Sequence, residues 1–105
     1  MSVVIQKAQR LIYQNRSRNG GTKLLVRARE IESSNKIVRL LQTSKGHHLA
    51  EILGSSGECY EVWLFTNGQV RCQCRFFTDL EPYQRQAIGC KHLLAHSLRL
   101  VKTAS

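Results

Sequence analysis

Near its amino terminus, the chain alternates apolar and polar residues with the period of an α-helix. Residues 3–14 carry one apolar face, which we call the N-terminal stripe, and this predicts a short amphipathic helix. Good helix formers over residues 22–33 predict a second helix with Thr22 as its N-cap. The polar stretch 15–22 between them predicts a loop. The N-terminal stripe consists of Val4, Ala8, Leu11 and Ile12.

From residue 36 onward, short apolar and β-branched runs separated by turn sequences predict an antiparallel meander. The strongest hairpin signal is Asn67-Gly68, because both residues tolerate the positive φ of a tight type I′ turn. The predicted strands span residues 36–43, 47–53, 59–65 and 69–74.

The carboxy-terminal part of the chain returns to helical spacing. Residues 75–89 lack a clear period, apart from one helical turn predicted around Pro82, and residues 90–101 predict a final helix with an apolar face. The predicted fold class is therefore α+β, with an N-terminal helical segment, a three- to four-stranded antiparallel meander and a C-terminal helix. We expect two parts, a basic helical arm and loop over residues 1–21 and a compact domain over residues 22–105.

The composition favours a small protein with a polyanionic partner. The 105 residues allow one small core, and 16 Lys and Arg against 7 Asp and Glu give a formal charge of +9. Nucleic acid is the first partner that this charge predicts, and an anionic membrane surface is the second. No apolar run approaches the ~20 residues that span a bilayer, and Lys7 and Arg10 interrupt the amino-terminal apolar stretch, unlike a signal peptide. We therefore expect an intracellular protein, cytoplasmic or nuclear, without a membrane or small-molecule partner.

Three of the four cysteines fall in two closely spaced groups, CxC at residues 72–74 and CxH at residues 90–92. Alternate residues of a strand point to the same side, so the first group can present both sulfurs together. Gly89 frees the backbone before the second group, which we expect at a helix start, where partial positive charge favours a thiolate. Three thiolates and one imidazole are a usual tetrahedral set for structural zinc. The predicted ligands of one structural Zn²⁺ are Cys72, Cys74, Cys90 and His92.

The residues alone leave alternatives to this zinc site. A redox dithiol usually has the spacing CxxC rather than CxC, and no thioredoxin-like βαβ pattern surrounds these cysteines. His96 lies four residues after His92 on the same helical face and could replace it as ligand. The cysteines could also be small buried apolar side chains, and this is the role that we expect for Cys59 in a partly buried form.

The basic residues are unevenly placed, because the first 29 residues carry +7 of the net charge and no acidic residue. A second basic group surrounds the proposed metal ligands. Arginine suits bidentate contacts with phosphate, and a lysine at a helix start adds to the backbone N–H groups there, although a solvated surface would show the same charges. Phe76, Phe77 and Trp63 could stack on bases or pack over the metal site and the sheet. The residues predicted to contact nucleic acid are Arg16, Arg18, Lys23, Arg27, Arg71, Arg75 and Lys91.

The CxC and CxH groups resemble the ligand pattern of the SWIM zinc finger. The likeness covers about two-thirds of the chain, from Arg27 to Ala95. It includes a helix with the sequence RAREI, a strand KIVRLL, a Gly-Ser-Ser-Gly turn at residues 54–57, a Tyr-x-Val strand at residues 60–62, and the segment CKHLLA at residues 90–95.

The resemblance implies a compact ββα finger stapled by zinc, which would occupy residues 22–105 and use the four ligands given above. SWIM fingers occur in chromatin-remodelling-type ATPases, in Mutator-type transposases and in small proteins that assist strand-exchange recombinases. Their implied role is to bind DNA or protein rather than to catalyse a reaction. This chain departs from the family where Arg75-Phe76 follows the CxC group, since a proline often stands there. The departure leaves the ligands intact.

Two functions fit these features. The first is a zinc-binding accessory protein that contacts nucleic acid, DNA more than RNA, through its basic surface. The alternative is a protein-interaction module in which the N-terminal stripe docks on a larger DNA-processing partner without contacting nucleic acid. We do not expect an enzyme, because a catalytic zinc keeps an open position that four protein ligands would fill. The sequence also offers no paired carboxylates in a plausible site, no phosphate loop and no nucleophile–base set.

Overall fold

A computed structural model describes residues 2–104 and confirms the α+β class. The chain begins with two helices, α1 (Val3–Ser17) and α2 (Gly21–Ser33). The strands that follow are β1 (Ile37–Gln42), β2 (His48–Leu53), β3 (Cys59–Leu64) and β4 (Val70–Cys72). The remaining helices are α3 (Arg75–Thr78), α4 (Pro82–Ala87) and α5 (Lys91–Ala104). Within the described residues, no helix combines the length and the apolar character that a membrane crossing requires.

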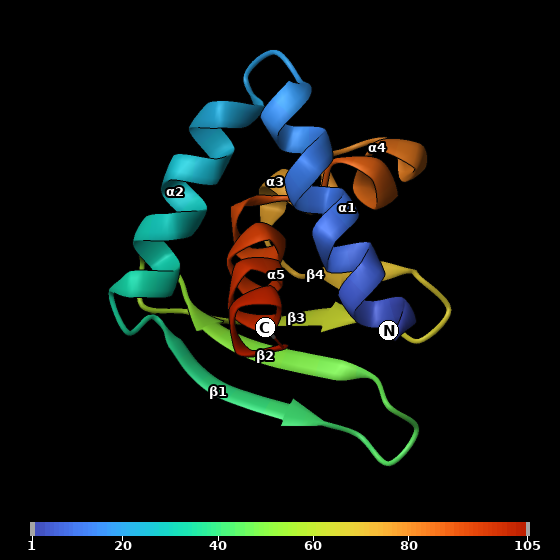
Figure 1. Cartoon of the computed structure of the whole chain (residues 1–105). Helices are drawn as coiled ribbons and strands as arrows, with labels where there is room; N and C mark the ends of the chain where they lie inside the picture. The colour runs from blue at the N-terminus through green and yellow to red at the C-terminus, as the bar shows by residue number, and fades with distance from the viewer. Residues whose placement is uncertain (1, 105) are drawn as a thin grey trace.

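The strands form one antiparallel sheet in the order β1-β2-β3-β4, which is the predicted meander. Figure 1 shows α1, α2 and α5 together on one side of this sheet. Ala50, Val62 and Cys72 are aligned on neighbouring strands, and all three are buried. The core therefore lies between the sheet and the three long helices.

Helix α5 is the central element of this core. It contacts both α1 and α2, and it also contacts β3 and β4, so that residues 92–97 are all buried. Arg99 fixes its far end, because Nη2 lies 2.9 Å from Glu32 Oε2 and donates to the Glu32 carbonyl at 3.1 Å. A helix buried on nearly every side gives a rigid support for the residues at its start.

The connection between α1 and α2 is much shorter than predicted. We expected a loop over residues 15–22, but α1 continues to Ser17. The reason is Asn15, whose side chain is buried and donates hydrogen bonds to the carbonyl oxygens of Leu11 at 2.9 Å and Ile88 at 3.0 Å. With these partners, a polar residue that normally favours loops is satisfied inside the last turns of a helix.

Two glycines make the corner between α1 and α2. The N-cap of α2 is Gly20, with a φ of 83°, and not Thr22 as predicted. Gly21 then approaches α1 so closely that a Cβ atom would lie 2.1 Å from the backbone oxygen of Asn15. Because this close contact involves backbone, no side-chain movement can relieve it.

Substitution of Gly21 by alanine should therefore cost more stability than an ordinary glycine substitution. We expect a loss of about 3 kcal/mol for Gly21→Ala, because overpacking against backbone forces α1 and α2 apart. Gly57→Ala is the control, since Gly57 has a φ of 90° but no atom within 4 Å of its hypothetical Cβ, and only a backbone cost of about 1 kcal/mol is expected there. Urea unfolding of the two variants measures the difference. Equal losses would contradict the close contact.

The N-terminal stripe is buried inside the molecule. Its four residues are at most 6% exposed, and α1 packs on α5 and α2 through them. The stripe therefore gives no support to docking on a partner protein, which was the basis of the alternative function. The predicted division of the chain after residue 21 stays a prediction, although α1 shares this core with the rest of the chain.

The turn between β3 and β4 differs from the predicted type I′ hairpin. Of its two central residues, only Gly68 has a positive φ, at 84°. The N–H of Gly68 donates to the carbonyl oxygen of Phe65 at 3.0 Å, and Asn67 Oδ1 accepts from the N–H of Gln69 at 2.9 Å. The turn is thus a three-residue loop that ends on a left-handed glycine, with asparagine stabilising it through its side chain.

The segment after this turn contains less strand and more helix than predicted. We expected a strand over residues 69–74, whereas β4 ends at Cys72. The irregular segment expected over residues 75–89 contains two short helices, α3 and α4, of which only the second was anticipated from Pro82. Both helices lie between the two predicted ligand pairs and bring them together.

Candidate metal centre

Four predicted ligands meet in one buried cluster. Their ligand atoms all lie within 4.8 Å of one another, and Cys72 Sγ is 3.9 Å from His92 Nδ1. In tetrahedral zinc sites, Zn–S bonds of ~2.3 Å and Zn–N bonds of ~2.0 Å place the ligand atoms roughly 3.5–3.8 Å apart. A small contraction would therefore allow the cluster to bind one metal ion. The cluster, called Cys3His below, consists of Cys72, Cys74, Cys90 and His92.

The first ligand pair comes from the end of β4. Cys72 is the last residue of the strand, whereas Cys74 is the N-cap of α3 and lies outside the predicted strand. Cys74 nevertheless keeps an extended backbone, with φ −70° and ψ 152°, so both sulfurs still point to the same side. Gln73 continues the pairing with β3, because its Oε1 accepts a hydrogen bond from the N–H of Glu61 at 2.8 Å.

The second ligand pair precedes and begins α5, as predicted. Gly89 has a φ of 74°, which turns the chain sharply into the helix. Cys90 directly precedes Lys91, the first helical residue, and its carbonyl oxygen accepts from the N–H of Leu94 at 2.9 Å. The sulfur of Cys90 and the ring of His92 are therefore fixed by the first turn of a buried helix.

Side chains from other elements hold both ligand pairs in place. Lys7 Nζ donates to the carbonyl oxygen of Gln86 at 2.6 Å, and Asn15 binds the carbonyl of Ile88 just before the second pair. The Gln86 side chain accepts from the N–H of Val70 at 2.8 Å and donates to its carbonyl at 3.1 Å. This amide covers the free edge of β4, so α1 and α4 together fix where the ligands meet.

Without an ion, the three thiols interact strongly with each other. The S–H groups of Cys72 and then Cys90 hydrogen-bond to Cys74 and hold its pKa far below the usual range for a thiol. The hydrogen bond to Cys74 raises the pKa of Cys72 to about 12. Burial, followed by the bonds to the other two sulfurs, raises the pKa of Cys90. A metal ion would stabilise all three sulfurs as thiolates.

The structure decides between the two candidate histidines and shows that the expected partial burial of Cys59 is wrong. His92, and not His96, lies with the three sulfurs among the described residues. Cys59 is exposed rather than partly buried, because it pairs with Leu53 on the side of the sheet away from the helices. All four cysteines are free thiols.

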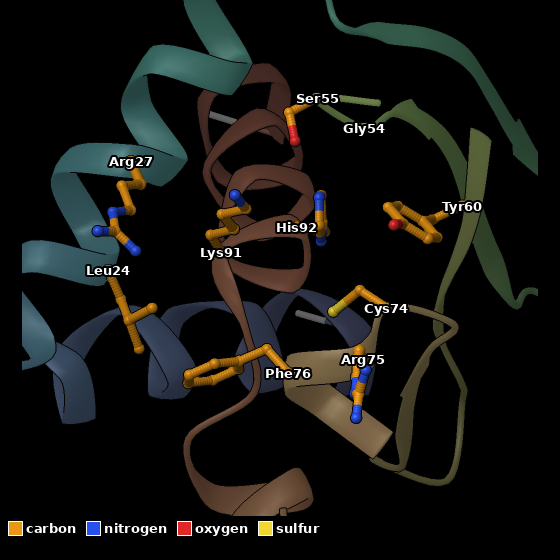
Figure 2. Close-up of a pocket in the computed structure, with 10 residues that line it drawn as sticks. All are labelled: Leu24, Arg27, Gly54, Ser55, Tyr60, Cys74, Arg75, Phe76, Lys91 and His92. Atoms are coloured by element: carbon orange, nitrogen blue, oxygen red, sulfur yellow. The ribbon is translucent and has the colours of Figure 1, made fainter. Parts of the chain in front are cut away.

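Three of the seven residues predicted to contact nucleic acid lie around one cavity beside the Cys3His cluster. The cavity has a volume of about 250 Å³, and Arg27, Arg75 and Lys91 line it together with Cys74 and His92. Figure 2 shows that these cations come from α2, α3 and α5. Residues that are up to 64 positions apart in the chain are thus brought to one place.

The other four predicted residues lie elsewhere. Arg16 and Lys23 are exposed on α1 and α2. Arg18 is half-buried and donates to two asparagine oxygens near the end of α1, both at 3.3 Å. Arg71 lies on the outer face of the sheet, with its guanidinium carbon 5.6 Å from the ring centroid of Phe65. These side chains do not form a single group with the cavity.

Two of the three aromatic residues pack against other side chains of the protein, and the third is exposed. Phe77 is buried beside the cluster, whereas Phe76 is 51% exposed next to the cavity. Trp63 stacks on Phe65, with ring centroids 5.5 Å apart, on the outer face of the sheet. Sequence reasoning missed Tyr60, whose ring centroid lies 5.0 Å from that of His92. Its position two residues before the buried Val62 was the signal that it faces the cluster.

Comparisons of the chain with protein-family models, with curated proteins and with solved structures found no match.

Proposed function

We propose that this protein is a small zinc-binding accessory protein of the SWIM type that contacts nucleic acid through its basic surface. The observation that carries the proposal is the buried Cys3His cluster with three cationic side chains around the adjoining cavity. Three thiolates and one imidazole favour zinc over magnesium or calcium, which prefer oxygen ligands.

The proposed ion has a structural role. It would join the end of β4 to the start of α5, two segments that are separated by α3 and α4 in the chain. Four protein ligands complete a tetrahedral shell and leave no position for a substrate or an activated water. We therefore propose one structural Zn²⁺, no catalytic activity and no small-molecule substrate.

Nucleic acid is the proposed partner because of the sign and placement of the charge. The chain carries a formal charge of +9, and Arg16, Lys23 and Arg27 are exposed on α1 and α2. Contacts between such side chains and phosphates release counterions, so they provide affinity without sequence preference. The preference for DNA over RNA follows from the SWIM resemblance alone.

Binding of labelled DNA and RNA, single- and double-stranded, to the zinc-loaded protein tests this function. For three phosphate contacts, the affinity should fall roughly 40-fold between 50 and 200 mM salt, and Arg16→Gln should weaken it. Arg39→Gln is the charge-matched control, because Arg39 is already paired with Glu51 at 3.2 Å. Fluorescence anisotropy gives the affinities, and metal analysis gives the zinc content. Absence of binding at low salt would exclude the proposal.

The alternative, a protein-interaction module without nucleic-acid contact, has no comparable support. Its basis was the N-terminal stripe, which the chain buries in its own core. Deletion of residues 1–14 would remove most of α1 and expose the facing side of α5, so loss of a partner in that variant would not identify a docking site.

A further inference from the structure

The cavity beside the Cys3His cluster has the chemical character of an anion site. Its charged lining side chains are the cations Arg27, Arg75 and Lys91, and no carboxylate group within residues 2–104 lines it. The three cations come from separate elements and line this cavity, although Figure 2 shows the Arg75 side chain extending away from Arg27 and Lys91. Such convergence from distant parts of the chain differs from a run of charges along one exposed helix.

His92 contributes a hydrogen-bond donor to the same cavity. Its Nδ1 faces the sulfur of Cys72 at 3.9 Å, so a metal ion bound through Nδ1 leaves the proton on Nε2. Metal-bound histidines usually donate this second N–H to a carboxylate or a carbonyl oxygen. Within the described residues, no such hydrogen bond of Nε2 is present, although the side chain is only 4% exposed and lines the cavity. Because His92 lines the cavity rather than the closed interior, a ligand in the cavity can supply the acceptor for this N–H.

The start of α5 adds to the positive potential. Lys91 is the first residue of this 14-residue helix, and the first turn contains no acidic side chain that would neutralise its dipole. A loaded cluster contributes a net charge of about −1, from three thiolates and one Zn²⁺. Glu58 is the nearby carboxylate, and the hydroxyl of Tyr60 donates to it. Asp79 lies 3.5 Å from Arg75, so Arg27 and Lys91 are the two lining cations that form no ion pair within residues 2–104.

We propose that this cavity holds one backbone phosphate of a nucleic-acid strand, with Arg27, Lys91 and the Nε2–H of His92 as its ligands. The inference rests on the function proposed above and names the group that the site receives. Arg75 stands at the rim, where its Nε is 3.5 Å from Asp79 Oδ2. His92 would then contact both the metal ion and the strand, so phosphate binding would alter a ligand of the metal centre directly.

Two observations favour a strand over a free nucleotide. The volume of about 250 Å³ is below the roughly 300–1,000 Å³ of pockets that enclose whole small molecules, so it suits one phosphate group. The exposed ring of Phe76 lies beside the cavity and offers a face on which the adjoining base can stack.

The test combines one variant with one spectroscopic signal. Arg27→Gln should reduce the slope of log affinity against log salt by about 0.7–0.9, which is the value of one phosphate contact. Arg29→Gln is the matched control, because Arg29 is exposed on the same helix but does not line the cavity. In the ¹⁵N-labelled, zinc-loaded protein, the Nε2 resonance of His92 should shift on addition of an oligonucleotide. Inorganic phosphate serves as the second probe.

The possible outcomes separate this inference from the proposed function. A reduced slope for Arg27→Gln alone, together with a shifted His92 Nε2 signal, supports the phosphate site. Oligonucleotide binding with equal slopes for both variants and an unmoved Nε2 signal overturns it, while the proposed function stands. A shift with inorganic phosphate in a protein that binds no oligonucleotide overturns both, and identifies a site for free phosphate.

Discussion

Removal of the metal ion is expected to abolish the folded state rather than merely weaken it. A structural zinc contributes an apparent ~10–16 kcal/mol, whereas a whole domain of this size has a net stability of about 5–15 kcal/mol. Without the ion, the buried Cys3His cluster joins β4 to α5 only through hydrogen bonds between thiols, and burial holds Cys90 in its uncharged form by raising its pKa. Circular dichroism and NMR dispersion of the reduced protein, recorded before and after chelation, measure the loss. Added zinc should restore both.

Two cysteine variants separate the ion from general effects of losing a thiol. Cys90→Ser should behave like the chelated protein even with zinc present, because serine does not replace a thiolate ligand. Cys59→Ser should stay within about 0.5 kcal/mol of the original protein, because Cys59 is exposed on the outer face of the sheet. Full dispersion and an unchanged melting temperature of the metal-free protein would contradict a structural ion.

The long elements could be predicted from the sequence because their patterns are local. The apolar face of residues 3–14 and the alternating runs after residue 36 each indicate which side of an element is buried. The corner between α1 and α2 could not be predicted in the same way. It depends on Asn15, whose partner Ile88 is 73 residues further along the chain. A polar residue in a helix end is stable only where tertiary contacts satisfy it.

The same contrast between local patterns and tertiary contacts explains which features of the site could be predicted from the sequence. The four ligands stand in two closely spaced groups, so their spacing alone indicated the cluster. The seven candidate cations, in contrast, could not be ranked, because only folding brings Arg27 beside Lys91. The position of His92 at the cavity was equally hidden, because the cavity exists only in the folded chain.

His96 should make the stability strongly dependent on pH. It is fully buried in α5, and both ring nitrogens lack a hydrogen-bond partner within residues 2–104. Burial, followed by the charge of His48, lowers the pKa of His96 from 6.5 to about 3. Below pH 6.5 the unfolded chain therefore binds a proton at His96, whereas the folded protein binds this proton only near pH 3. The contribution of His96 to the free energy of unfolding is fully present above pH 6.5 and falls as the pH decreases towards 3.

Comparison with His96→Leu isolates this contribution. At pH 7 the apolar replacement should be close to neutral or stabilising, because it removes two unsatisfied polar atoms. Between pH 7 and pH 5, the original protein should lose about 2 kcal/mol more than the variant, since pH 5 lies about 1.5 units below the unfolded pKa and each unit corresponds to about 1.4 kcal/mol. Urea unfolding in excess zinc at both pH values measures this difference, and protonation of the metal ligands affects both proteins alike. Parallel pH profiles of the two proteins would show that the pKa of His96 is the same in the folded and unfolded states, and this would contradict the prediction.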